Sequence, residues 1–158
     1  MLLWIGMGLI VAAVAPYVVY LIGINIGRKP DKLPVPLEYP AISIIISAYN
    51  EEAVIKERVQ NILASSYPVD RYEVIFIDDC SSDNTKRIAE EAFTEAGITH
   101  RIIANTERLG TNRSYNKVMG LARYPIIVTT DADVFFERDA LAHLIARLIS
   151  DDRIAAVC

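Results

Sequence analysis

The 158 residues suffice for one ordinary domain, and a formal net charge of −4 makes the chain only mildly acidic. The 16 lysines and arginines are scattered among 20 acidic residues without a basic run, which excludes the electrostatic footprint of a nucleic-acid-binding protein. Cys80 and Cys158 are too few for a disulfide framework and lack the spacing of zinc ligands, so a reducing compartment is expected.

The N-terminal stretch is apolar and carries no charged side chain before Arg28. Because a helix crosses a bilayer in roughly 20 residues, residues 1–27 are predicted to form a transmembrane helix, with the span over residues 2–24. A cleaved signal peptide is the alternative, but the basic start of such peptides is missing. Arg28, Lys29 and other cations follow the span, so the positive-inside rule predicts a membrane protein whose remaining domain is cytoplasmic.

Residues 28–40 contain four prolines, a composition typical of an extended linker, and the folded domain is predicted over residues 41–158. In that domain short apolar runs alternate with amphipathic stretches. Strands are predicted at residues 41–47, 72–78, 99–105, 124–130 and 153–158, and helices at about residues 51–65, 84–96, 112–123 and 138–149.

Near-continuous apolar strands separated by helices predict an α/β fold with a mostly parallel sheet covered on both faces. Asn50 is a candidate cap for the first helix, and Gly97 is a candidate stop for the second. In folds of this class, ligands bind outside the carboxyl ends of the strands. The residues that follow the strands are therefore the candidates for a functional site.

Polar side chains gather after three of the predicted strands: Ser47, Tyr49, Asn50 and Glu51 after the first, Asp78 and Asp79 after the second, and Asp131 and Asp133 after the fourth. Turn chemistry alone explains any one of these groups. Together they place several acids at one sheet edge, which favours a bound cation or a hydrogen-bonding ligand. Alternate side chains of an extended backbone point the same way, so the last two carboxylates can share Mg²⁺ or Mn²⁺.

Four segments in this order carry a family resemblance: "PAISIIISAYNEE", "YEVIFIDDCSSDNT", "NTERLGTNRSYNKVMGLA" and "IIVTTDADVFF". They resemble the successive signatures of inverting family 2 glycosyltransferases of the GT-A fold, and the resemblance covers residues 40–158. It implies a three-layer, Rossmann-like domain that transfers a hexose from a nucleotide-diphosphate sugar to a polysaccharide, lipid or other acceptor. The apolar N-terminus is similar to that of membrane-bound members.

The resemblance also implies roles for particular residues. Asp133, with Asp131, would hold Mg²⁺ or Mn²⁺, and Asp78 would organise a loop. Thr111 stands where some members have a lysine, so Arg113 is the candidate phosphate contact in this segment. UDP-linked sugars are the first expectation and GDP-linked sugars the second. The donor is expected to contact Ser47, Tyr49, Asn50, Glu51, Asp79, Arg113, Asp131 and Ala132.

The resemblance breaks off at the C-terminus, because the base that activates the acceptor in this family is expected beyond Cys158. The chain is therefore expected to be the donor-binding half of an enzyme and to be inactive by itself, with the acceptor unknown. Two alternatives stay open. A haloacid-dehalogenase-like phosphatase would use Asp131 as nucleophile and Asp133 as acid, but leaves the upstream strands without a role. A membrane-tethered module would bind nucleotide without turnover.

Overall fold

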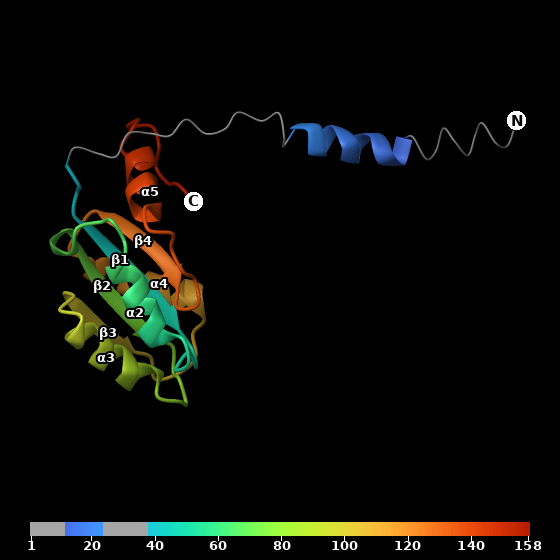
Figure 1. Ribbon diagram of the computed structural model, residues 1–158. Helices are drawn as coiled ribbons and strands as arrows, with labels where there is room; N and C mark the ends of the chain where they lie inside the picture. The colour runs from blue at the N-terminus through green and yellow to red at the C-terminus, as the bar shows by residue number, and fades with distance from the viewer. Residues whose placement is uncertain (1–11, 24–37) are drawn as a thin grey trace, which may run out of the picture. The chain divides into compact units, whose positions relative to one another are not determined.

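The computed structural model describes residues 12–23 and 38–158, which belong to two separate units, residues 1–33 and 34–158 (Figure 1). In the first unit, residues 12–23 are helical. Among the described residues, no helix combines the length and the hydropathy that a bilayer crossing needs. The rest of the predicted span, and the predicted linker up to residue 37, lie outside the described ranges.

The second unit is built on one parallel sheet of four strands in the order β3-β2-β1-β4. The central strands β1 and β2 are buried along their whole length, which explains why their sequences are near-continuous apolar runs instead of alternating ones. The predicted parallel α/β sheet is confirmed. Its strands are β1 (Ile42–Ala48), β2 (Tyr72–Asp78), β3 (His100–Ala104) and β4 (Ile126–Asp131).

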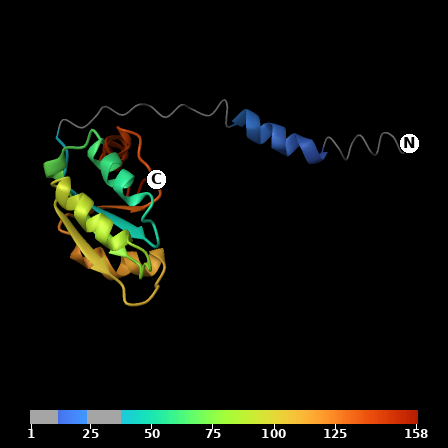
Figure 2. The same ribbon diagram turned by 60° about the horizontal axis from the view of Figure 1, so that its bottom comes forward.

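Helices cover both faces of this sheet and make a three-layer domain. Alternate residues of β1 point to opposite faces, so Ile44 and Ile46 join the larger core and Ile45 joins a smaller one. The larger core also contains side chains of α2 (Ile55–Leu63), α3 (Thr85–Glu95) and α5 (Ala140–Leu148), whereas α4 (Thr111–Val118) contributes to the smaller core. Figure 2 shows α2 and α3 side by side on one face of the sheet.

The helix boundaries correct two of the sequence-based expectations. The helix α2 begins at Ile55 with Val54 at its N-cap, so Asn50 does not cap it. The helix expected to reach residue 123 ends at Val118 and continues as a short 3₁₀ turn. Gly97, by contrast, follows α3 with a φ of 66°, the left-handed conformation that terminates many helices.

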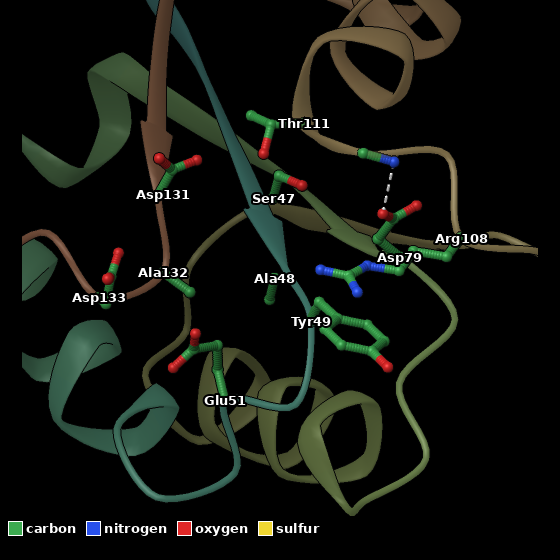
Figure 3. A pocket seen from close by; sticks show the side chains of 11 residues that line it. Ser47, Ala48, Tyr49, Glu51, Asp79, Arg108, Thr111, Asp131, Ala132 and Asp133 are labelled. Carbon is green, nitrogen blue, oxygen red and sulfur yellow. Dashed lines mark hydrogen bonds between the residues drawn. The ribbon is translucent and has the colours of Figure 1, made fainter.

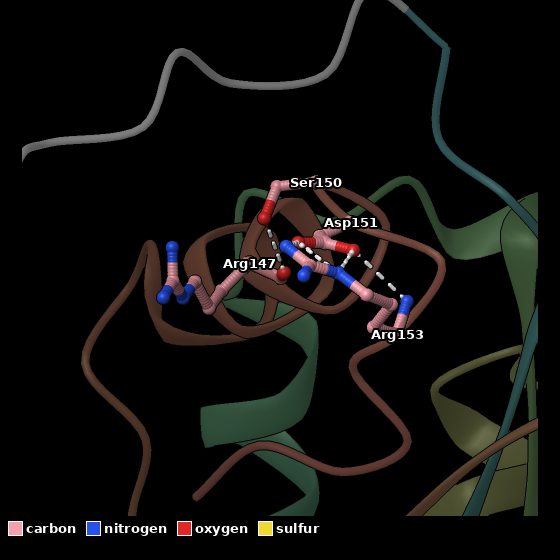
Figure 4. Close-up of polar contacts among 4 residues, drawn as sticks. All are labelled: Arg147, Ser150, Asp151 and Arg153. Atoms are coloured by element: carbon pink, nitrogen blue, oxygen red, sulfur yellow. Dashed lines mark hydrogen bonds and ion pairs between the residues drawn. The ribbon is translucent and has the colours of Figure 1, made fainter.

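The fifth predicted strand, residues 153–158, does not form. Asp151 instead accepts hydrogen bonds from the backbone N–H and the guanidinium of Arg153, and Ile154 N–H donates to the Asp151 carbonyl, which closes a turn after α5 (Figure 4). Residues 155–158 line an apolar groove beside β4 but make no ladder with it. An apolar run becomes a strand only when its backbone groups pair with a neighbour.

Candidate functional site

A pocket of about 250 Å³ opens at the carboxyl edge of the sheet. The chain moves outward from β1 through β2 to β3 and then returns to β4 on the other side of β1. This reversal leaves a crevice between the ends of β1 and β4, the place where open parallel sheets bind ligands. The pocket is lined by Ser47, Ala48, Tyr49, Glu51, Asp79, Arg108, Gly110, Thr111, Asp131, Ala132 and Asp133 (Figure 3).

The carboxylates of Glu51, in the loop after β1, and of Asp131 and Asp133, at and just after the end of β4, face this pocket (Figure 3). Burial raises the pKa of Glu51 above its ordinary value, and the charges of Asp133, Asp83 and Asp131 raise it further. Like charges held this close disfavour the ionised form unless a cation neutralises them. Two carboxylates one residue apart fit Mg²⁺ or Mn²⁺, which use few protein ligands and complete their shells with water or phosphate oxygens.

Asp131 and Asp133 would hold such an ion, although the described residues contain no group of three or more His, Cys, Asp or Glu side chains arranged around a metal position. Asp131 is the last residue of β4, and Asp133 follows in the adjoining turn. The backbone N–H of Ala132, between them, donates to the Ser47 carbonyl at 3.2 Å. The start of the turn is thereby tied to the end of β1.

Tyr115 of α4 holds Asp131 on one face of the sheet. Its hydroxyl lies 3.0 Å from Asp131 Oδ1 and 2.9 Å from the carbonyl oxygen of Thr130. Burial raises the pKa of Tyr115, and the neighbouring Asp131 charge raises it further, so the phenol stays protonated and can donate. No sequence pattern singles out Tyr115, because the contact depends on how α4 packs against the sheet.

Removing that hydroxyl should loosen Asp131 without opening a cavity. We expect Tyr115→Phe to lower the free energy of unfolding by about 1 kcal/mol and to weaken Mn²⁺ binding severalfold, measured by urea denaturation and Mn²⁺ electron paramagnetic resonance. Tyr124→Phe is the matched control, because the Tyr124 hydroxyl bonds to no residue in the described part of the chain. Equal losses of Mn²⁺ affinity in both variants would contradict this role.

Asp79 organises the loop between β3 and α4. Asp79 is buried, and its carboxylate accepts hydrogen bonds from Leu109 N–H at 2.9 Å and, as Figure 3 shows, from Gly110 N–H at 2.8 Å. The Asn105 amide and the Ser114 hydroxyl also donate to it, at 2.7 and 3.1 Å. Both carboxylate oxygens therefore bind protein donors, although Asp79 still lines the pocket.

The expected loop organiser was Asp78, and that expectation is wrong at the level of the side chain. Asp78 is buried, its Oδ1 has no hydrogen-bond partner among the described residues, and only its backbone carbonyl reaches the loop, by accepting from Asn105 N–H. Asp78 is the last residue of β2 and Asp79 follows it directly, so the two side chains point to opposite sides of the extended backbone. That alternation gives the organising role to Asp79.

The loop that Asp79 holds brings Arg108 into the pocket. The Arg108 guanidinium stacks on the Tyr49 ring with its carbon 3.9 Å from the ring centre, and it is the only cation among the lining residues (Figure 3). Gly110 has a φ of 80°, which a residue with a Cβ rarely adopts, and it lets the chain turn into α4. Arg113, the predicted phosphate contact, lies one turn into α4, is exposed and does not line the pocket.

Asn50, the other predicted contact that does not line the pocket, joins two loops instead. Its side-chain oxygen accepts from Ser82 N–H at 2.8 Å, and its own N–H donates to the Ser81 hydroxyl at 3.0 Å. Glu51 N–H donates to the Thr85 hydroxyl at 2.7 Å, so the loop after β1 is fastened to the start of α3. Asn50 takes a φ of 56°, which asparagine tolerates better than most residues.

Comparison with known proteins covers both the sequence and the fold. The model of the family "Glycosyl transferase family 2" matches residues 43–158. This chain belongs to glycosyl transferase family 2. Its four-stranded parallel α/β domain is that of the GT-A neighbours, and the expected family and fold are confirmed.

Two curated relatives of this family 2 domain each match about three quarters of the chain. It is 32% identical over 122 residues to the probable glycosyltransferase YdaM of Bacillus subtilis, covering 76% of this chain and 29% of the relative. It is 34% identical over 119 residues to the beta-monoglucosyldiacylglycerol synthase of Trichormus variabilis, covering 75% and 25%. The chain thus spans between a quarter and a third of the length of these curated relatives.

A solved structure matches most of the chain. The mannosyltransferase PcManGT from Pyrobaculum calidifontis, in complex with GDP-Man and Mn²⁺, has a TM-score of 0.78 and 32% identity over 95% of this chain and 45% of that one. The family match includes β1, β2 and β3 as well as the turn after β4. The phosphatase alternative, which gives those upstream strands no role, is therefore not favoured.

Proposed function

We propose that this chain is the donor-binding portion of a metal-dependent, inverting hexosyltransferase that uses a nucleotide-diphosphate sugar. The observation that carries the proposal is the convergence of Glu51, Asp131 and Asp133 at the switch point of a family 2 sheet, with one arginine on the opposite wall. A nucleoside diphosphate bound with a divalent cation complements this distribution of charge. GDP-linked and UDP-linked sugars are the two candidate donors, and the similar structure in complex with GDP-Man supports a GDP-linked sugar.

Different pocket residues would bind different parts of such a donor. The exposed Tyr49 ring and the Arg108 guanidinium stacked on it offer a flat surface and a positive charge to the nucleotide. Ser47 lies at the end of β1 beside Asp131, its ladder partner, so the Ser47 hydroxyl can donate to a phosphate or ribose oxygen and the Asp131 carboxylate can accept from a ribose hydroxyl. Asp133, with Asp131, would hold Mg²⁺ or Mn²⁺, and such an ion neutralises charge on a departing diphosphate.

Acceptor activation is proposed to depend on a base outside this chain, in keeping with relatives of which the matched region covers only 29% and 25%. A positioned base removes the proton of an acceptor hydroxyl as that oxygen attacks the anomeric carbon from the face opposite the diphosphate. The pocket described here supplies the donor side of that geometry. The chain alone is therefore proposed to bind donor without transferring sugar, and the acceptor is a polysaccharide, a lipid or another hydroxyl.

The test of the proposed function is calorimetric titration of GDP, and separately UDP, into the full chain in detergent micelles. One nucleotide is expected to bind with Mn²⁺ present and to lose most of its affinity when EDTA is added. Binding of neither nucleotide by the folded chain would refute the donor-site assignment. Phosphate release from a phosphomonoester without nucleotide, lost in Asp131→Asn, would instead support the phosphatase alternative.

We also propose that the N-terminus anchors the domain to a membrane with the pocket on the cytoplasmic side. The support is the uncharged stretch of residues 1–27 and the cations that follow it. Cys80 is exposed in the folded domain. In a Cys158→Ser background, a membrane-impermeant maleimide should label Cys80 only after sealed cells are permeabilised. Labelling in intact cells, or recovery of the chain without membranes, would contradict the proposal.

A further inference from the structure

Arg58 of α2 is a buried cation that no carboxylate in the described part of the chain neutralises. Its side chain is fully buried, and among the described residues it forms no ion pair and its Nε has no hydrogen-bond partner. Burial lowers the pKa of Arg58 to about 10, so the guanidinium keeps its charge at neutral pH. Burying an unpaired charge opposes folding, and a well-packed apolar side chain of similar volume would avoid this cost.

The hydrogen bonds and the ring contact of the Arg58 side chain connect it to the turn that carries Asp131 and Asp133. Its Nη2 donates to the Thr130 hydroxyl at 3.2 Å, and its guanidinium carbon lies 4.2 Å from the centre of the Phe136 ring. Thr130 immediately precedes Asp131, and Phe136 follows Asp133 by three residues. One buried side chain therefore touches the chain on both sides of the two carboxylates.

Asn61, one helical turn later, completes this attachment. Its side-chain oxygen accepts from Arg58 Nη1 at 2.7 Å and from Phe136 N–H at 2.8 Å, while its amide donates to the Phe136 carbonyl at 2.8 Å. Both backbone polar groups of Phe136 are thus bound by one side chain. Residues at positions i and i+3 of a helix lie on the same face, which places Arg58 and Asn61 together against the turn.

The alternation of β4 explains why two helices are needed. Thr130 and Asp131 are consecutive in an extended strand and point to opposite faces. Tyr115 of α4 holds Asp131 on one face, and Arg58 of α2 holds Thr130 on the other. The end of β4 is thereby fixed from both sides before the chain turns to Asp133.

We propose that Arg58 and Asn61 are positioning residues that fix the turn of residues 130–136, so that Asp131 and Asp133 present their carboxylates to a divalent cation and the diphosphate that it holds. This inference rests on the proposed function for the identity of the ligand. Groups that orient metal-binding side chains without touching the metal commonly change metal affinity by roughly 10- to 100-fold when they are removed. Arg58 and Asn61 meet that description through Thr130 and Phe136.

A role in positioning differs measurably from a role in packing. Arg58→Met keeps most of the buried volume and removes the unpaired charge, so the unfolding midpoint in urea should change little or rise. The same variant frees the Thr130 hydroxyl and loosens Asn61. Amide exchange in residues 131–136 and Mn²⁺ affinity should therefore change, although global stability does not fall.

The experiment compares Arg58→Met, Arg58→Lys and Asn61→Ala with the unmodified full chain in detergent micelles. Hydrogen exchange followed by mass spectrometry measures how well the backbone amides of the turn are protected. Electron paramagnetic resonance measures the affinity for Mn²⁺ in the absence of nucleotide. All three variants should exchange faster over residues 131–136 and bind Mn²⁺ about tenfold more weakly. Arg58→Lys keeps the charge but loses the two-pronged contact, so it should resemble Arg58→Met. Phe93→Leu, a change in the buried core of α3, is the control and should alter neither readout.

Unchanged exchange over residues 131–136 in the Arg58 and Asn61 variants would overturn the inference, as would an equal effect of Phe93→Leu. Should Arg58→Met fail to fold, Asn61→Ala provides the same comparison, because Asn61 is only half-buried. If the unmodified chain binds neither Mn²⁺ nor nucleotide, the proposed function fails, and hydrogen exchange becomes the test of the positioning role. Faster exchange over residues 131–136 in the variants then supports that role, and unchanged exchange refutes it.

Discussion

Asp133→Asn should abolish most of the metal-dependent affinity for a nucleoside diphosphate, with a loss of at least about a hundredfold. The substitution keeps the size of the side chain but removes the negative charge that a hard cation prefers as a ligand. Stabilisation of phosphate charge by a bound cation is worth several kcal/mol, and each factor of ten in affinity corresponds to about 1.4 kcal/mol. Calorimetric titration of GDP and UDP with and without Mn²⁺ measures the effect.

The same variant should not be less stable without metal. The charge of Asp133 is the second largest cause, after burial, of the raised pKa of Glu51, so its removal relieves repulsion between like charges. Asp70→Asn is the matched control, because Asp70 is an exposed carboxylate just before β2, at the opposite edge of the sheet. Nucleotide affinity that depends on Mn²⁺ equally in Asp133→Asn and in Asp70→Asn would rule out Asp133 as a metal ligand.

Asp79→Ala should be the most destabilising substitution at the pocket. It leaves the N–H groups of Leu109 and Gly110 without their acceptor and removes one of the two acceptors of the Asn105 amide. An unpaired buried polar group costs about 1–3 kcal/mol, and partial rehydration of the loop limits the sum, so we expect a loss of about 3 kcal/mol in the free energy of unfolding. Urea denaturation checks this value. Nucleotide affinity should also fall, because the loop carries Arg108 into the pocket.

The pH dependence provides a second readout for Asp79. Burial by itself raises the pKa of Asp79, but the hydrogen bonds from Leu109, Asn105, Gly110 and Ser114 outweigh it and hold the pKa below its ordinary value. A carboxyl group with a lowered folded-state pKa stabilises the fold above its unfolded value of about 3.9 and loses that contribution as the pH falls through the folded value.

The difference in free energy of unfolding between the unmodified chain and Asp79→Asn should therefore be largest at neutral pH and should decrease below about pH 4. Asp70→Asn serves again as the control, since among residues 12–23 and 38–158 the Asp70 carboxylate makes only an exposed ion pair with Arg71. A gap that is constant from pH 7 to pH 2 would show that the Asp79 charge does not stabilise the loop.

The pattern of residues along the chain predicts the parallel sheet and the acidic residues at its carboxyl edge. Apolar runs such as that of β1, buried on both faces, predict parallel strands between helices, and parallel strands bring their carboxyl ends to one edge. Ser47, Glu51, Asp131 and Asp133 could be assigned to one pocket for that reason. These inferences succeed because they depend on chain direction and on side-chain alternation, which are local properties.

Tertiary packing determines which side chains at that edge line the pocket and which ones hold the pocket residues in place. Arg108, and not Arg113, lines the pocket because hydrogen bonds to Asp79 shape the loop before α4. Residues 153–158 form no strand because strand formation depends on an available partner as well as on apolar composition. Arg58 lies amid polar helix residues in the sequence, and its burial against Thr130 joins positions 72 residues apart. Contacts over such separations come from packing, which no local pattern encodes.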